Sequence, residues 1–459
     1  LTKTLDELSV HEISIKDRDT DVTANVMLNK KTIDMAFKGI LASSTFNTIF
    51  AHPMSSDSSL KGDFRAHILL KDPKQSRVEG VMDGKNLSIP LGLTVPLIVR
   101  NITLEAKDEN FIIKTAQIKA GEQELTLTGT ISTSPSWFTV DMDLTSDGFD
   151  WETVENIVRG TKIAKDSKDS KDSKEAGFLE NFPLKGTLRM QLGYLKYRQF
   201  KWEPFHADVS LDGKTIHIRS KKAALCGIST TGDMDITAGG AEIDVALSAK
   251  NLELEPTILC ISDKKVDVTG IFDMKADLKA KGKLDTIAKS LNGSFSVSAK
   301  KGKIFKSQSL DKTLDLVNET ENVKGKLPDL NKTMIDYRAF TASGKIKEHM
   351  VDVEQATLDA STFGILAQGQ VDLYNQTVDL NALVAPVNFA QGIVGKIPVL
   401  GHLMGGSIVS IPVKIRGNLS DPEVTFLSPS AIGSAFLGIM ERTLKLPITI
   451  IEPVLPAKK

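Results

Sequence analysis

Residues 272–280 read FDMKADLKA, and this stretch decides the fold because its polarity changes at every residue. The apolar side chains are those of Phe272, Met274, Ala276, Leu278 and Ala280, and the polar ones are those of Asp273, Lys275, Asp277 and Lys279. Successive side chains of a β-strand point to opposite faces of the sheet. The stretch therefore predicts a strand with one dry face and one wet face.

The same alternation recurs along most of the chain. Residues 97–145 form four successive runs with polar residues between them, and further runs continue to residue 384. The apolar side of these runs includes Leu125, Leu127, Ile131, Phe138, Val140, Met142, Leu144, Ile243, Val245, Leu247, Phe295, Val297, Val378 and Leu380. Aromatic residues make up only 6% of the chain, while Thr, Ser, Val and Ile recur in short runs. The sequence predicts a mainly β protein.

Local signals place turns between several strands. Asp212 and Gly213 stand between two alternating runs and form the strongest short hairpin signal. Gly193 predicts a second hairpin, which joins Leu184–Leu192 to Tyr194–Trp202. Ser88–Pro96 contains one glycine and two prolines, so we expect a loop or an edge crossing there.

Helical patterns are few. We expect helices at residues 38–51, 150–161 and 310–318, and a C-terminal helix from Pro429 to Leu444. The apolar stretch at 387–404 is interrupted by glycine and proline, whereas a membrane-spanning helix needs roughly 20 uninterrupted apolar residues. A short helix and an apolar turn are expected there instead.

Residues 165–175 read KDSKDSKDSKE and contain no apolar side chain. Such a repeat cannot bury a core, so we expect a disordered, solvated insertion. This gives three predicted parts: a β segment at 1–160, the insertion at 161–176 and a second β region at 177–459.

Charge excludes some classes of partner. The chain has 57 basic and 58 acidic residues, a formal net charge of -1. A nucleic-acid-binding protein normally has a basic excess, so no nucleic-acid partner is expected. The chain starts at Leu1 without a charged and apolar leader, so we expect any signal peptide or anchor to have been removed or to lie outside this sequence.

The two cysteines, Cys226 and Cys260, leave two alternatives open. They are either two buried thiols or one structural disulfide, which an oxidising compartment would permit. Closing a loop of this size contributes about 3–4 kcal/mol in the chain-entropy model.

No catalytic or metal-binding pattern emerges. GIVGK at Gly392–Lys396 is too short for a phosphate loop, and neither HExxH nor GxSxG occurs. The seven histidines are scattered singly, and Asp141 and Asp143 lie on the wet side of a strand. We expect no enzymatic activity, no cofactor and no metal.

Many one-faced strands must cover their dry faces somewhere. Two sheets can pack as a sandwich, a sheet can close as a barrel, or a long sheet can curl around its own apolar face. The alternation alone does not choose among these, and an ordinary packed β core is the simplest expectation. A curled sheet lined by Val, Ile, Leu, Ala and Met would leave room for acyl chains, and an empty apolar trough would be prone to aggregate.

Several segments carry a family resemblance. They are ALCGI at Ala224–Ile228, LNGSFSVSAKKGKIFK at Leu291–Lys306, KGKLPDL at Lys324–Leu330 and the glycine- and proline-rich region from Leu380 to Pro453. Together they resemble the C-terminal region of the AsmA-like family of bacterial envelope proteins. The resemblance covers Phe182–Pro453 well and the first 160 residues only in general character.

The resemblance implies a long antiparallel sheet, curled into a half-pipe groove with an apolar interior and a few short helices near the C-terminus. It implies a periplasmic protein, anchored to the inner membrane, that carries phospholipid acyl chains towards the outer membrane. The apolar side chains given above, with Phe272, Met274 and Leu278, would line this groove. The termini would contact membrane. The alternative is a structural or assembly factor that influences outer-membrane protein insertion through envelope protein partners.

Overall fold

The computed structural model shows a mainly β protein. It describes residues 7–45, 57–70, 75–89, 97–134, 136–152, 184–262, 268–283, 286–305, 308–318, 334–361, 363–386 and 411–427. The described strands belong to one sheet of 24 strands that is not closed. The predicted fold class, a long curled sheet with a few short helices, is confirmed.

The chain forms two compact units. The first unit comprises residues 1–225 and 231–240, and the second comprises residues 226–230 and 241–459. The predicted insertion at 161–176 lies outside the described residues. The strands that precede and follow it, β9 (Phe138–Ser146) and β11 (Leu184–Leu192), pair with each other along their whole length within the first unit.

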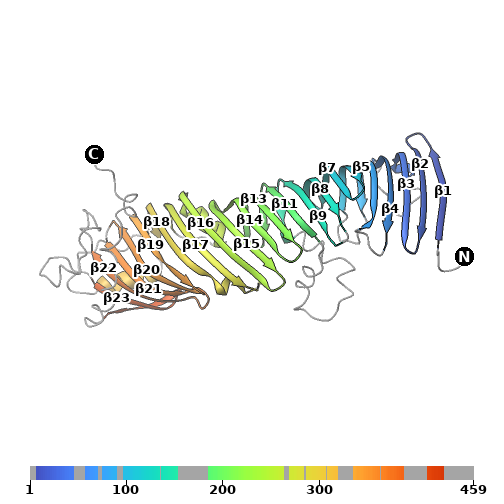
Figure 1. The fold of residues 1–459 in the computed structure, drawn as a ribbon. Helices are drawn as coiled ribbons and strands as arrows, with labels where there is room; N and C mark the ends of the chain where they lie inside the picture. Colours follow the sequence, from blue (N-terminus) through green and yellow to red (C-terminus); the bar gives the residue numbers. More distant parts are fainter. Residues whose placement is uncertain are drawn as a thin grey trace, which may run out of the picture. The chain divides into compact units, whose positions relative to one another are not determined.

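The first unit is a sequence of neighbouring strands, coloured blue to green in Figure 1. Besides β9 and β11 they are β1 (Glu7–Lys16), β2 (Asp21–Asn29), β3 (Thr32–Ala42), β4 (Ser59–Leu69), β5 (Arg77–Ile89), β6 (Leu97–Lys107), β7 (Asn110–Ala120), β8 (Gln123–Thr133), β10 (Phe149–Asp150), β12 (Leu195–Tyr197), β13 (Phe200–Asp212) and β14 (Ile216–Leu225). β15 (Ile228–Thr237) is divided between the two units. The hairpin predicted at Asp212 and Gly213 is confirmed, because Leu211 pairs with Ile216.

The second predicted hairpin is wrong. β11 pairs in parallel with β9 and antiparallel with β13, and β12 pairs with β13 and in parallel with β10. Gly193 therefore ends β11 without folding the chain back onto it. The reversal occurs instead between β12 and β13, where Arg198 has a positive φ of 54°.

The prediction of a helix at 38–51 is also wrong for the first part of this segment. β3 continues to Ala42, and Lys38–Ala42 pairs with Ser59–Asp63 of β4. Residues 43–45 are helical, and the rest of the segment lies outside the described residues. In the segment predicted at 88–96, Ser88 and Ile89 belong to β5 and not to a loop. In the helix predicted at 150–161, Asp150 belongs to β10 and residues 151–152 are helical, while the rest lies outside the described residues.

The second unit contains strands and three short helical elements among its described residues (Figure 1). They are β16 (Gly240–Glu253), α5 (Leu254–Ser262), β17 (Ile271–Gly282), η2 (Ile287–Ser290), β18 (Asn292–Phe305), α6 (Gln308–Asn318), β19 (Met334–Lys347), β20 (Met350–Ala360), β21 (Phe363–Asp372), β22 (Thr377–Pro386), β23 (Ile411–Asn418) and β24 (Asp421–Phe426). The helix predicted at 310–318 is confirmed as α6. The predicted elements at 387–404 and 429–444 lie outside the described residues.

The register of the second unit defines two rims of its sheet. The register places the turns β19–β20, β21–β22 and β23–β24 at one rim, where Lys347, Asp372 and Asn418 end their strands. At the other rim, the chain leaves β16 to form α5 and leaves β18 to form α6. Both helices therefore start from the same rim of the sheet, and we call this the helix rim.

Curling of the second unit follows from the position of α6. This helix starts soon after β18 ends, yet Lys312 contacts Asp421 at the start of β24. In a flat sheet, six strand spacings would separate β18 from β24 by about 29 Å. A helix of 11 residues is only about 16 Å long, and Lys312 is in its first half. The sheet must therefore curl for α6 to reach β24.

Close approach of neighbouring strands requires glycine in the first unit. Gly186 of β11 has a φ of +122°, and a Cβ atom there would lie 1.8 Å from the carbonyl oxygen of Val140. Only glycine adopts this conformation without strain. Gly186 thus permits the close parallel pairing of β11 with β9.

Candidate apolar groove

Cross-strand register gathers the apolar residues of the second unit on one face. Met274 pairs with Val297 and Ala276 with Phe295, while Lys275 pairs with Ser296. The face continues through Val245, which pairs with Leu278. Further along, Ala367 pairs with Ala382, which pairs in turn with Val413. One face of this unit is apolar because the two-residue periods of neighbouring strands are in register at these pairs.

The first unit has the same organisation. Leu127 pairs with Leu144 and Ile131 with Val140, which places the predicted residues of β8 and β9 side by side. On the next strand, Leu188 pairs with Met142. Leu144 belongs to a buried cluster with Phe149 and Leu192.

The predicted lining residues fall into two groups by exposure, and none is fully exposed. The buried ones are Val140, Met142, Leu144, Phe272 and Val378. The half-buried ones are Leu125, Leu127, Ile131, Phe138, Ile243, Val245, Leu247, Met274, Leu278, Phe295, Val297 and Leu380. The described strands form a single sheet, so no second sheet covers this face within the part of the chain that the structure describes. A curled sheet that is open on one side leaves the side chains of its inner face partly buried in this way.

Several residues of the apolar face were missed from sequence. In the first unit, Phe37 and Phe64 stack with ring centroids 5.2 Å apart and join Val22 and Leu41 in a cluster. In the second, Phe363 and Val413 are completely buried. Phe37 follows two-residue spacing from Ile33 and Met35, so the alternation in β3 was the available signal.

Tyr337 introduces a polar atom into the apolar cluster of the second unit. Its side chain is 3% exposed, and its hydroxyl donates a hydrogen bond to the carbonyl oxygen of Thr269 at 2.7 Å. Burial raises the pKa of this phenol above its usual value. The partner is required because an unpaired hydroxyl would be costly in this environment.

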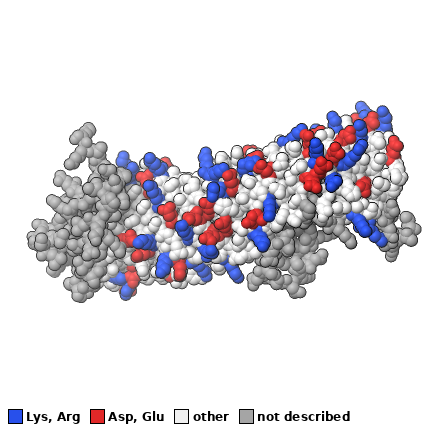
Figure 2. Space-filling view, viewed as in Figure 1, with Lys and Arg blue, Asp and Glu red and all other residues white. Residues whose placement is uncertain are grey.

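The opposite face of the sheet is charged and solvated. Arg189 contacts Asp141 and Asp143, and its guanidinium hydrogen bond holds the pKa of Asp143 below the usual value. Hydrogen bonds to Asp244 and Glu242 raise the pKa of Lys279 and Lys281, respectively. Figure 2 shows basic and acidic side chains interspersed over the visible face. This face has the character of solvent-exposed sheet surface.

A disulfide joins Cys226 to Cys260, with Cα atoms 5.8 Å apart. Of the two alternatives left open by the sequence, the structure contains the bonded pair. Cys226 lies in the tight turn before β15, and Cys260 lies in α5. Leu254 and Ile261 of α5 also pack against the apolar cluster. The bond therefore fixes α5 at the helix rim.

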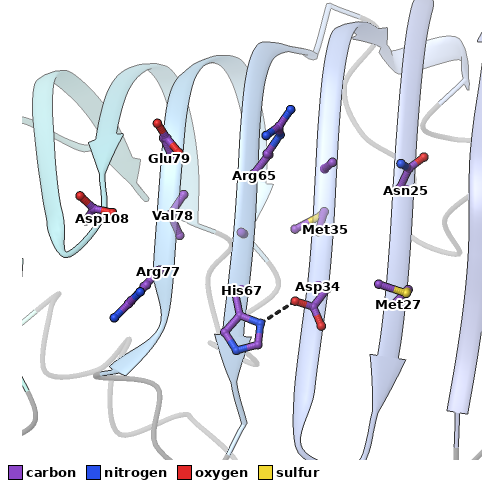
Figure 3. A pocket seen from close by; sticks show the side chains of 12 residues that line it. Asn25, Met27, Asp34, Met35, Arg65, His67, Arg77, Val78, Glu79 and Asp108 are labelled. Carbon is purple, nitrogen blue, oxygen red and sulfur yellow. Dashed lines mark hydrogen bonds and ion pairs between the residues drawn. The ribbon is translucent and has the colours of Figure 1, made fainter.

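The described residues also form two shallow hollows. One, of about 400 Å³, lies over β2 to β5 and is lined mostly by polar side chains, including Asp34, Arg65, His67 and Arg77 (Figure 3). His67 Nδ1 and Asp34 Oδ1 are 2.5 Å apart at its edge. The other hollow, of about 510 Å³, lies between α6 and β24. The apolar face itself is an open surface without an enclosing wall, and it is defined by the exposure of its side chains.

Three of the described histidines contact nearby carboxylates. His67 contacts Asp34, His217 contacts Asp233 and Asp235, and His349 approaches Asp372. Within the described ranges, no group of three or more His, Cys, Asp or Glu side chains is arranged to bind a metal ion. His52 and His402 lie outside those ranges.

Among the helices described, none is both long enough and apolar enough to cross a membrane. The chain nevertheless presents continuous apolar surface in each of its units. No protein-family model matches the chain, and no curated protein matches it either.

Proposed function

We propose that this protein binds lipid and carries phospholipid acyl chains along its apolar face. The observation that supports this most directly is a continuous apolar face on a single-layered sheet, half-buried and without a second described sheet to cover it. Acyl chains would lie on this face while headgroups remain in water at the open side. The protein acts in this proposal as a carrier and not as an enzyme.

Transfer energetics favour such a surface. Exposing an acyl chain to water costs about 0.8 kcal/mol per methylene, or roughly 12 kcal/mol for a chain of sixteen carbons. Movement along an apolar face avoids this cost, because one apolar environment replaces another. The lining offers few polar groups, so headgroup selectivity should be weak.

The resemblance to the AsmA-like family suggests the setting. We propose a periplasmic location, an anchor in the inner membrane, membrane contact at the termini and transport between the inner and outer membranes. A disulfide between Cys226 and Cys260 is compatible with an oxidising compartment of this kind.

The alternative function is that of a structural or assembly factor. Within the described residues, β1 pairs with β2 alone, so one of its edges has free backbone donors and acceptors. An exposed strand edge can add a strand from another chain. A stoichiometric protein partner together with a lipid-free apolar face would favour this structural or assembly function.

Lipid mass spectrometry on protein purified in a mild, exchangeable detergent tests the main proposal. The test variant combines Val140→Asp, Val245→Asp and Met274→Asp on the apolar face. The matched control combines Thr139→Asp, Ala246→Asp and Lys275→Asp, which are exposed neighbours on the polar face. We expect phospholipid with the wild type and the control but not with the test variant, while circular dichroism shows all three folded. A wild type that carries no lipid and excludes a photoreactive acyl probe would mean that the face is a closed core.

A further inference from the structure

Helix α6 lies on the apolar side of β24. Its Leu314 is 1% exposed and belongs to the buried cluster of the second unit, against which Leu310 and Leu316 also pack. On β24, Val424 pairs with Ile415 and packs against the same cluster. α6 therefore covers part of the face that we propose for acyl chains.

The strands next to β24 continue its apolar face. Ile415 pairs with Leu380, a predicted lining residue, and Val413 pairs with Ala382. Val413 and Val384 are completely buried. The apolar surface that α6 covers at β24 thus continues into β23 and β22.

Among the described side chains of α6, Leu310, Leu314 and Leu316 pack against the apolar cluster, and Thr313 is also buried. Lys312 Nζ donates to Asp421 Oδ1 at 2.5 Å and lies 3.5 Å from the carbonyl oxygen of Pro422. The side chains of Lys312 and Asp421 are 47% and 62% exposed. Exposed ion pairs contribute little stability, and a helix of 11 residues is marginal on its own.

An acyl chain and the leucine side chains of α6 are both apolar, so the two can compete for this site. The hollow beside α6 is lined by Lys312, Asp315, Leu316, Asp421, Glu423 and Val424. It opens at the edge of the covered surface, next to the exposed ion pair.

We propose that the apolar surface of β22 to β24, which α6 covers at β24, is an acyl-chain site and that α6 is its displaceable cover. The inference rests on the proposed function, because it requires the apolar face to accept lipid. Acyl chains enter this site when α6 leaves β24, and α6 returns when the site is empty. The ion pair between Lys312 and Asp421 biases the cover towards the closed position.

Zero-length coupling with a carbodiimide tests this proposal in the full chain. The reagent joins the Lys312 amine to the Asp421 carboxylate, which are already in contact, and so fixes α6 on β24. The matched control is Lys312→Arg, which retains the ion pair but offers no amine for coupling. Both proteins receive the reagent and then a photoreactive sixteen-carbon fatty acid. Peptide mapping measures labelling of residues 377–386 and 411–427, and labelling of residues 138–146 and 271–282 is the internal reference.

We expect labelling beneath α6 to fall to background in the coupled wild type but not in the coupled Lys312→Arg protein. Without coupling, Lys312→Glu should raise that labelling about two- to fivefold, and Lys312→Glu combined with Asp421→Lys should restore it. Normal labelling of the reference peptides with no effect of coupling would overturn the cover while leaving the proposed function intact. Absence of labelling from every peptide would reject the proposed function itself.

Discussion

Arg189 of β11 binds Asp143 of β9 through two hydrogen bonds, with Nε–Oδ1 and Nη2–Oδ2 distances of 2.6 Å and 2.9 Å. The two residues are directly opposite in the register of the parallel pair. This contact joins two strands that are far apart in the sequence, and it lies on the polar face. A forked guanidinium contact of this type adds geometric specificity to strand pairing.

Asp143→Asn should lower the thermal midpoint slightly, by about 1–3 °C, because the pair is largely exposed. Arg189 keeps the pKa of Asp143 below its ordinary value. The stabilisation is therefore complete above the ordinary aspartate pKa and is lost as the pH falls through the lower folded value. Thermal melts of both proteins between pH 2 and pH 7 should converge at the acidic end. A constant difference between the two midpoints across this range would contradict a stabilising role of the ionised Asp143 carboxylate.

Gly186→Ala should destabilise the first unit strongly. The substituted Cβ would lie 1.8 Å from the Val140 carbonyl oxygen, and the φ of +122° is itself strained for alanine, at about 1–3 kcal/mol before the clash. Gly121→Ala is the control, since Gly121 also has a positive φ but has nothing within 4 Å of its added Cβ. Urea unfolding should show a much smaller loss for the control. Equal losses would mean that the close approach of β9 and β11 contributes nothing.

The strands could be predicted from the sequence because alternation is a local signal. Phe272 and Met274 face one way and Asp273 the other whatever their partners are, and β17 is found where the pattern placed it. The parallel pairing of β9 with β11 is a long-range choice, and the glycine between β11 and β12 gave a local signal for a hairpin that does not form. A helix was predicted at Lys38–Ala42, whereas pairing with β4 decides for a strand.

The candidate site was predictable only in part. Alternation identified which side chains share a face, and the structure places the predicted ones on such faces. Alternation is the same in a sandwich, a barrel and a curled sheet, so it could not identify the architecture. The cover formed by α6 depends on a contact between Lys312 and Asp421, which are 109 residues apart, and no periodic signal reports such a contact.

Removing the disulfide should destabilise the second unit by about 3–4 kcal/mol, since the bond spans 34 residues of sequence. Urea unfolding of the protein with Cys226→Ser and Cys260→Ser gives this quantity. Hydrogen exchange should show faster exchange in α5 than in β17, because the bond connects α5 to the turn before β15. The same variant treated with reductant is the control and should show no further change. Unaltered exchange in α5 would show that Leu254 and Ile261 suffice to fix the helix.

Tyr337→Phe should cost about 1 kcal/mol at neutral pH, because it removes the hydrogen bond to Thr269 and leaves that carbonyl oxygen unpaired. Burial raises the pKa of Tyr337, so the folded state binds the phenolic proton more tightly than the unfolded chain does. The contribution of Tyr337 is thus fully present below the ordinary tyrosine pKa and is lost as the pH rises through the raised folded value. Urea unfolding at pH 7 and at pH 10.5 should therefore show a smaller difference between wild type and variant at the higher pH.

Tyr374→Phe is the control, since Tyr374 is 62% exposed and should show little effect at either pH. A Tyr337→Phe difference that grows with pH would mean that the ionised phenolate is stabilised at this site, against the burial that the structure shows.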